Sequence, residues 1–349
     1  MNHTSVNIAI HDRPGSFSDR WIEYCEEKRI PYKRVSCYDN NIIDQLKSFD
    51  ILLWHWHHAD PKAILFARQL ITSLENMGIK IFPNSNTCWH FDDKVGQKYL
   101  LESIHAPLVP SYVFFDEKEA MDWIEEIEFP KVFKLRTGAG SENVKLVQNH
   151  SEARKLIKTA FNRGFKVRAG YFSDLTTKLR NTIYQRDYLG KIKRLPTSLF
   201  NIYENNKKRD REKGYIYFQD FIANNDCDTR VTVIGNRAFT FRRLVRKDDF
   251  RASGSGDIVY DQSQINIQCI KIAFEVAARL QSQSMAFDFI EGKGSKPLIV
   301  EVSYCYVSSA VRDCQGYWDM NLQWHEGTIW PQDAILEDLL AEAQSRDKC

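Results

Sequence analysis

The chain has 349 residues, of which 43% are hydrophobic and 27% charged, so disorder, collagen and coiled coil are excluded. This length predicts about two domains, with a third possible if one is small. The net charge of +2 provides no global field that would attract nucleic acid or an acidic membrane surface.

Eight cysteines are dispersed along the chain without a CxxC pair, which indicates neither a disulfide framework nor a zinc site. The first thirty residues lack the apolar run of a signal peptide. No apolar stretch approaches the ~18 residues of a membrane span. We therefore expect a cytoplasmic protein without a membrane span.

Residues 1–91 alternate strand-like and helix-like stretches, as a small parallel sheet with helices does. Strands are predicted at 6–10, 51–54 and 79–82, and an amphipathic helix at 63–74. The pattern predicts a three-layer, Rossmann-like α/β domain.

The second segment, residues 92–214, has α+β character. Its first predicted helix covers 93–104. Strands at 132–135 and 144–147 flank a glycine turn, and Ser151 is expected to cap the helix that follows.

A basic insert, residues 166–213, ends this segment with thirteen basic and five acidic side chains, a net charge of +8. We expect the insert to form a flap that recognises an anionic acceptor. One alternative is a mobile basic loop that aids solubility. The other is a nucleic-acid module, which we disfavour because aromatic residues are few and no RNA-binding motif accompanies the charge.

The third segment, residues 215–349, has predicted strands at 215–222, 229–234 and 238–244, a helix at 265–280 and then a hairpin. Its tail is rich in aromatic residues, among them Tyr306, Tyr317, Trp318 and Trp324. Such side chains suit a sugar ring or a flat acyl group, and an aromatic seam between domains is the alternative.

The hairpin of residues 285–303 gives the sharpest chemical signal. If its turn is centred between Gly294 and Ser295, Asp288 lies opposite Glu301 on one face of the sheet. The two carboxylates would then repel by ~3 kcal/mol at an effective dielectric of ~20, so a cation is expected between them. Oxygen ligands in small number favour Mg²⁺ shared with phosphate oxygens. A register shifted by one residue, with both acids solvated, is the alternative.

Other patterns indicate an anion-binding site. Lys134 lies inside an apolar strand, and a buried lysine needs an anion. The turn after it, which contains Gly138, Gly140 and Ser141, brings backbone N–H groups to a polyphosphate or serves only as a hairpin turn. Arginines on the later strands would clamp a phosphate or belong to a solvated basic hairpin: Arg230, Arg243 and Arg251.

Three histidines, His55, His57 and His58, follow the predicted strand at 51–54, at the end where α/β sheets place ligand loops. His55 and His57 alternate onto one face of the chain. They chelate a metal, line a substrate site or pack in the core.

In this order the motifs resemble the ATP-grasp superfamily, most closely its glutathione synthetase and ribosomal-protein S6 glutamate ligase (RimK-like) branch. The resemblance covers about residues 90 to 305, and the preceding α/β unit resembles a pre-ATP-grasp domain. The residues that carry it are Asp93-Lys94, the strand 129–134 with Gly138, residues 219–222, Asp228 with Arg230, Arg243, Arg251, Asp288, and Glu301 with Ser303.

The resemblance implies an α/β and α+β protein with the ATP-grasp fold, in which 92–214 is the small subdomain and 215–349 the large one. It also implies which residues bind ATP: Lys94 and Lys134 at the phosphates, Gln219 with the backbone of Asp220 and Phe221 at the adenine, and Asp228 close by.

The remaining implied roles concern metal and substrate. Asp288 and Glu301 would bind Mg²⁺, and the three arginines would neutralise the transferred phosphate and the substrate carboxylate. Ser303 and Ser253 depart from the family pattern, where asparagine is usual at both positions. A hydroxyl can still ligate Mg²⁺ or donate a hydrogen bond, so we retain Ser303 as a metal ligand.

The resulting functional prediction is an ATP- and Mg²⁺-dependent carboxylate–amine ligase that works through an acyl phosphate. The expected partners are a small-molecule or saccharide carboxylate and an amine, since the tail resembles ATP-grasp proteins of surface-polysaccharide pathways. A homodimer is left open. The alternative is a nucleotide-binding regulator that has kept the fold without turnover.

Overall fold

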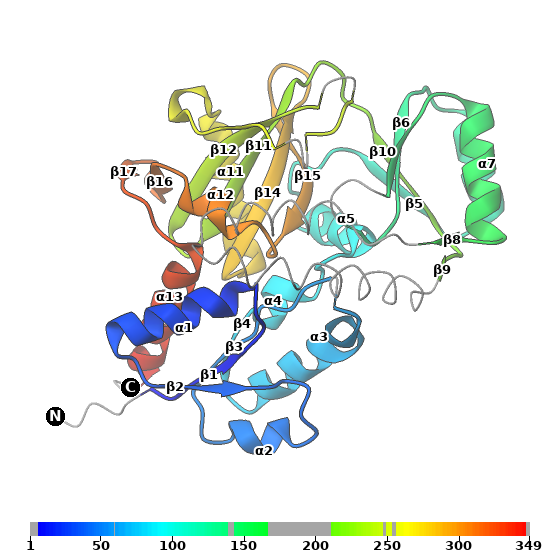
Figure 1. The fold of residues 1–349 in the computed structure, drawn as a ribbon. Helices are drawn as coiled ribbons and strands as arrows, with labels where there is room; N and C mark the ends of the chain where they lie inside the picture. Colours follow the sequence, from blue (N-terminus) through cyan, green and yellow to red (C-terminus); the bar gives the residue numbers. More distant parts are fainter. Residues whose placement is uncertain are drawn as a thin grey trace, which may run out of the picture.

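The computed structural model describes residues 6–58, 60–138, 143–166, 211–246, 249–252 and 256–346. The strands of these residues form three sheets and one short two-stranded ladder (Figure 1). Among the described residues, no helix combines the length and the apolar composition needed to cross a membrane.

The first sheet is parallel, in the order β2-β1-β3-β4. Its strands are β1 (Ile8–His11), β2 (Tyr32–Val35), β3 (Ile51–Leu53) and β4 (Lys80–Phe82), and its helices are α1 (Phe17–Lys28), α2 (Ile42–Leu46), α3 (Pro61–Asn76) and α4 (Ser85–Cys88). The central strands β1 and β3 are fully buried, as expected for a sheet covered on both faces. The predicted α/β character is confirmed, and the strand that escaped prediction, β2, is an edge strand with exposed Lys33 and Arg34.

The second sheet is antiparallel, in the order β5-β10-β6-β7. It consists of β5 (Ser111–Phe114), β6 (Lys131–Lys134), β7 (Val144–Val147) and β10 (Ile216–Asp220), with α6 (Glu117–Glu125) and α7 (His150–Phe161) packed in the same core. The predicted cap of α7 was wrong. Asn149, rather than Ser151, accepts the hydrogen bond from the Glu152 N–H, because it is the last residue with extended backbone before the helix.

The strands β8 (Phe165–Lys166) and β9 (Arg211–Glu212) pair with each other as a short antiparallel ladder. They directly precede and follow residues 167–210. Almost all of the predicted basic insert therefore lies outside the described residues. After β9 the chain enters β10, which belongs to the second sheet. The division at 91 and 214 stays our proposed domain organisation. In the structure β10 follows the second of these boundaries but pairs with β5 and β6, which precede it.

The third sheet has the order β15-β14-β11-β12-β16-β17, with β13 paired to β12. Its strands are β11 (Cys227–Ile234), β12 (Arg237–Leu244), β13 (Ile258–Val259), β14 (Ser284–Glu291), β15 (Pro297–Ser303), β16 (Gly316–Asp319) and β17 (Trp324–Glu326). Three helices accompany it: α5 (Lys94–Ser103), α11 (Ile267–Leu280) and α12 (Ser308–Arg312), with the 3-10 turn η1 (Gln262–Gln264) before α11. Leu101 of α5 and Val276 of α11 share one hydrophobic core with this sheet.

The helix α13 (Pro331–Arg346) returns to the first sheet and lies beside α1 (Figure 1). The Arg20 guanidinium donates two hydrogen bonds to Asp333, at 2.8 and 2.7 Å, and the Trp21 indole donates to the Gln332 carbonyl at 2.9 Å. Ile335 and Leu339 are buried in the same core as β1 and β3. The hydrophobic core around the first sheet is therefore completed by α13, the last helix of the described residues.

Candidate active site

The hairpin β14–β15 places the two predicted carboxylates opposite each other. Asp288 pairs with Glu301, as predicted. The turn itself is centred on Gly294, half a residue before the predicted centre between Gly294 and Ser295. Beyond Asp288 the register shifts at a β-bulge, so that Phe289 pairs with Ile299. The predicted pairing is confirmed because the bulge compensates for the error in the turn.

Asp288 is held by two arginines from the neighbouring strands. The Arg230 guanidinium donates to both of its oxygens, at 2.7 and 2.8 Å, and Arg243 Nη2 lies 2.9 Å from Oδ2. Arg243 is only 7% exposed and also donates two hydrogen bonds to Asp228, at 2.7 and 2.5 Å. The four side chains form a ladder of alternating charge across β11, β12 and β14.

The ladder also fixes the protonation of Asp288. Burial alone would raise the pKa of this carboxyl, but Arg230 and Arg243 outweigh it and hold the pKa well below its usual range. Asp288 is therefore ionised. The cation that we expected beside it is supplied by the protein's own arginines, and these two guanidinium groups are already engaged by carboxylates.

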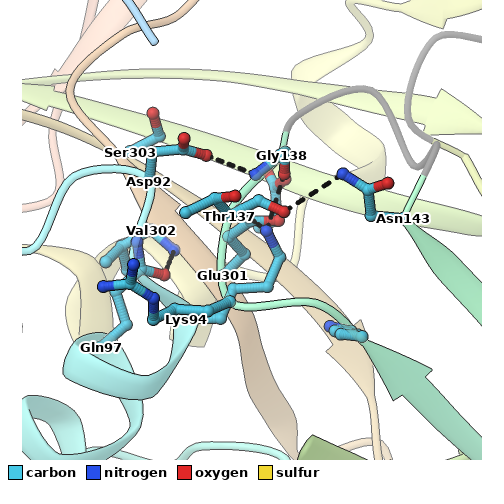
Figure 2. A network of polar contacts seen from close by, with 12 residues as sticks. Asp92, Lys94, Gln97, Thr137, Gly138, Asn143, Glu301, Val302 and Ser303 are labelled. Carbon is cyan, nitrogen blue, oxygen red and sulfur yellow. Dashed lines mark hydrogen bonds and ion pairs between the residues drawn. The ribbon is translucent and has the colours of Figure 1, made fainter. Parts of the chain in front are cut away.

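The second carboxylate, Glu301, contacts a different cation. Its Oε1 lies 3.2 Å from Nζ of Lys94, which also donates to the Gly138 carbonyl at 2.8 Å (Figure 2). Lys94 is 6% exposed, whereas 35% of the Glu301 side chain is accessible. Burial favours neutral Lys94, but Glu301 and Asp92 reverse this effect and raise its pKa, so the ammonium stays charged.

Lys134 is buried, and no carboxylate among the described residues is in direct contact with it. Its Nζ donates to Gln219 Oε1 at 2.6 Å, and the Gln219 amide donates in turn to Ser111 Oγ at 3.0 Å. The side chain is 5% exposed. Burial lowers the pKa of Lys134 to about 8, and the more distant Glu301 carboxylate opposes this shift only in part.

The start of the glycine turn is firmly bound. The Gly138 N–H, which we expected to face a phosphate, donates to Asp92 Oδ1 at 2.7 Å (Figure 2). Gly138 has φ +112°, and a Cβ there would lie 2.2 Å from Asn143 Nδ2, so the position requires glycine. Gly140 and Ser141 lie outside the described residues, as does Ser253.

The remaining predicted site residues have protein partners too. Asp220 accepts a hydrogen bond from Lys131 Nζ at 2.6 Å. The Phe221 ring contacts that of Phe250, next to Arg251. Two further contacts are internal to their loops: Arg251 with Asp249 at 2.7 Å, and the Ser303 hydroxyl with the Cys305 carbonyl at 3.2 Å.

Sequence reasoning missed three residues that shape this region. Asp92 and Glu212 bind the backbone of the glycine turn, and Gln97 accepts a hydrogen bond from the Val302 N–H at 3.3 Å, next to Glu301. Asp92 precedes the predicted helix at 93–104, which was the one available signal. Nothing in the local sequence links Glu212 to the glycine turn, because Arg136 and Thr137 lie 75 or more positions away.

The three histidines do not form one cluster, because His55 packs apart from the other two. His55 is buried and stacks on Phe17, with ring centroids 3.9 Å apart, whereas His57 lies against His58. Burial lowers the pKa of His55 well below its usual range, so its ring is neutral. No group of three or more metal-ligating side chains is found in the part of the chain that the structure describes. For His55 the contacts match the packing alternative.

Residues 203–315 match the family model of the RimK-like ATP-grasp domain. The whole fold is similar to D-alanine–D-alanine ligase from Bacillus anthracis complexed with ATP, with a TM-score of 0.58 and 12% identity over 98% of this chain and 99% of that one. It is also similar to a RimK-domain ATP-grasp protein from Sphaerobacter thermophilus, with a TM-score of 0.55 and 15% identity over 96% of this chain and 100% of that one.

The chain has the ATP-grasp fold. A third similar structure is the biotin carboxylase domain of 2-oxoglutarate carboxylase from Hydrogenobacter thermophilus, in complex with MgADP, ADP and bicarbonate. Its TM-score is 0.56 and its identity 13%, over 94% of this chain and 68% of that chain. The comparison with curated proteins finds no match. The predicted ATP-grasp fold is confirmed, and function has to be argued from the site.

Proposed function

We propose that this protein is an ATP-dependent carboxylate–amine ligase that forms an amide through an acyl phosphate. The proposal rests on a cluster in which two buried lysines, Lys94 and Lys134, lie near two opposed carboxylates, Asp288 and Glu301. The second and third sheets both contribute to this cluster. The ATP-grasp neighbours, one crystallised with ATP and one with MgADP, support a nucleotide at the corresponding place.

Lys134 is the observation that carries the nucleotide assignment. The direct partner of this buried ammonium is a neutral amide, and the more distant Glu301 carboxylate offsets only part of the cost of its desolvation. A phosphate oxygen in contact with Nζ would supply that charge. Lys94 would be the second phosphate ligand, and Gln219 with the backbone of Asp220 and Phe221 would border the adenine.

The metal proposal rests on the donor types. Asp288, Glu301 and Ser303 offer only oxygen atoms, which fit Mg²⁺ and disfavour zinc. Glu301 is the more accessible of the two acids, whereas both oxygens of Asp288 also bind arginine. When bound together with ATP, Mg²⁺ would neutralise phosphate charge at this position.

The proposed reaction has two steps. An oxygen of the substrate carboxylate attacks the γ-phosphorus of ATP, and ADP leaves as the acyl phosphate forms. The amine then attacks the carbonyl carbon, inorganic phosphate leaves, and the nitrogen loses a proton to give the amide. Arg230, Arg243 and Arg251 would lie around the anionic groups. Each guanidinium has five donors, so the present ion pairs of Arg230 and Arg243 leave capacity for an anion.

The acyl phosphate can be tested without knowing the amine. Purified protein is incubated with MgATP, a pool of carboxylic acids that includes carboxylated saccharides, and hydroxylamine as a small nucleophile. We expect ADP release that depends on the acid, together with an acyl hydroxamate. ATP binding without acid-dependent ADP release from any pool would favour the nucleotide-binding regulator instead.

Replacement of Lys134 by alanine is predicted to weaken ATP binding at pH 7 by about 1.5 to 3 kcal/mol, the contribution of a hydrogen bond to a charged group. Calorimetric titration with ATP measures this change. The matched control is Lys145→Ala on the adjacent strand β7, where the lysine is half exposed and pairs with Glu152. That variant should keep the wild-type affinity.

The pH dependence provides a second readout of the same lysine. Below its pKa of about 8 Lys134 is charged and attracts phosphate, and above it the neutral amine does not. The affinity of the wild type for ATP should therefore fall as the pH rises from 7 to 9, and Lys134→Ala should lack this fall. A flat wild-type profile would place the nucleotide phosphates elsewhere.

A further inference from the structure

The glycine turn begins at residues 136–138, where both backbone N–H groups and backbone carbonyls form hydrogen bonds to other parts of the chain. Three consecutive N–H groups each donate to a carboxylate: those of Arg136 and Thr137 to Glu212, at 3.0 and 3.1 Å, and that of Gly138 to Asp92 at 2.7 Å. The Arg136 N–H also donates to the Tyr215 hydroxyl, at 2.6 Å. The carbonyls accept from other parts of the chain, that of Arg136 from the Lys94 N–H at 2.9 Å and that of Gly138 from Lys94 Nζ at 2.8 Å. Successive N–H groups of this kind commonly bind anions, and here the anions are the protein's own acids.

Glu212 is saturated by these contacts. Oε1 accepts from the N–H and the hydroxyl of Thr137, and Oε2 accepts from the Arg136 N–H and the Tyr215 hydroxyl. A carboxylate offers about four acceptor positions, so all of them are used. Burial and Glu212 raise the pKa of Tyr215, which keeps this hydroxyl protonated and donating.

The bound backbone leads directly to the proposed ATP site. Lys94 Nζ is held between the Gly138 carbonyl and Glu301 (Figure 2). The position of this ammonium therefore depends on where Glu212 and Asp92 hold the backbone of residues 136–138. Glu212 is also the last residue of β9, and its acid group joins that strand to the turn that follows Lys134.

We propose that Glu212 is a positioning residue for nucleotide binding: it fixes the backbone of residues 136–138, and through Gly138 it sets the position of Lys94. The inference rests on the proposed function, since it assumes that Lys94 contacts ATP. Glu212 itself touches no phosphate in this assignment. Asp92 has the same role at a single N–H group.

Glu212→Gln tests the proposal with almost no change in shape. An amide has acceptor positions on one atom only, so its NH₂ group would face two of the four donors that converge on Glu212. Amide hydrogen exchange should accelerate at Thr137 or at Arg136, whichever N–H group faces the NH₂ group, and stay slow at Gly138. Asp92→Ala should accelerate exchange at Gly138 and leave it slow at Arg136 and Thr137, because Asp92 binds only the Gly138 N–H among these three groups.

The same variants are then titrated with ATP. We expect the dissociation constant for ATP to rise about tenfold in Glu212→Gln, the scale seen when residues that orient a ligand-binding group are changed. Glu125→Gln, which removes a carboxylate from an exposed ion pair in the same segment, serves as the control and should bind ATP as the wild type does.

The outcomes separate the two proposals. Failure of the wild type to bind ATP would overturn the proposed function, and the exchange pattern would still report on the hydrogen bonds of Glu212. Wild-type ATP affinity in Glu212→Gln, with exchange accelerated at Arg136 or Thr137, would overturn the positioning role. Unchanged exchange at these two amides would overturn it as well.

Discussion

Replacement of Arg243 by methionine should lower the free energy of unfolding by about 3 to 5 kcal/mol, the effect of removing one partner from a buried ion pair. Arg243 lies between Asp228 and Asp288 and is almost fully buried. Methionine fills similar space but leaves Asp228 without the guanidinium that binds both of its oxygens. Urea unfolding of the purified variant measures the loss.

Two controls make this result specific. Arg154→Met removes an arginine from an exposed pair with Glu125 and should change stability by only about 0 to 1 kcal/mol. Adding Asp228→Asn to Arg243→Met should recover part of the lost stability, because the uncompensated charge is then removed. Equal stability of the wild type and the Arg243 variant would show that the charge ladder makes no net contribution.

Replacement of Glu301 by glutamine should abolish Mg²⁺-dependent ADP formation, since the change keeps the shape of the side chain and removes the more accessible of the two proposed metal-binding charges. Repulsion between Asp288 and Glu301 alone would make this variant more stable than the wild type. The contacts indicate otherwise, because Glu301 neutralises buried Lys94. We expect stability to fall by about 1 to 3 kcal/mol, the cost of weakening a buried charged hydrogen bond.

The measurements are steady-state ADP release against Mg²⁺ concentration and, separately, urea unfolding. Glu291→Gln is the matched control, because this acid is exposed and lies at the turn end of β14. Wild-type turnover by Glu301→Gln would contradict the metal assignment. A gain in stability would contradict the role of Glu301 as the counter-charge of Lys94.

Much of the fold follows from local patterns in the sequence. The buried strands β1 and β3 are short apolar runs, and the helix at 93–104 begins at a capping aspartate, so both kinds of element were predictable. The edge strand β2 was not, because Lys33 and Arg34 give it the polarity of a loop. The membership of β10 in the second sheet depends on pairing across the segment 167–210, which no local pattern specifies.

The candidate site was predictable in its residue types and less so in its partners. A lysine inside an apolar strand indicated a buried cation, and Lys134 is one. The three arginines appeared as free clamps in the sequence, whereas the structure pairs Arg230 and Arg243 with acids on neighbouring strands. Such pairings arise from register and side-chain reach, and the bulge beside Asp288 shows how one extra residue changes both.

Because α13 packs against the first sheet, this sheet lacks part of its core until α13 has been synthesised. Arg20 and its partner Asp333 are 313 positions apart in the sequence. At about 5 to 20 residues per second, a ribosome needs roughly 16 to 60 s to synthesise the intervening chain. During that time α1 lacks its neighbour, and the apolar surface that later covers Ile335 and Leu339 is open to solvent or to a chaperone. The strands of the first sheet are thus translated well before the helix that completes their core.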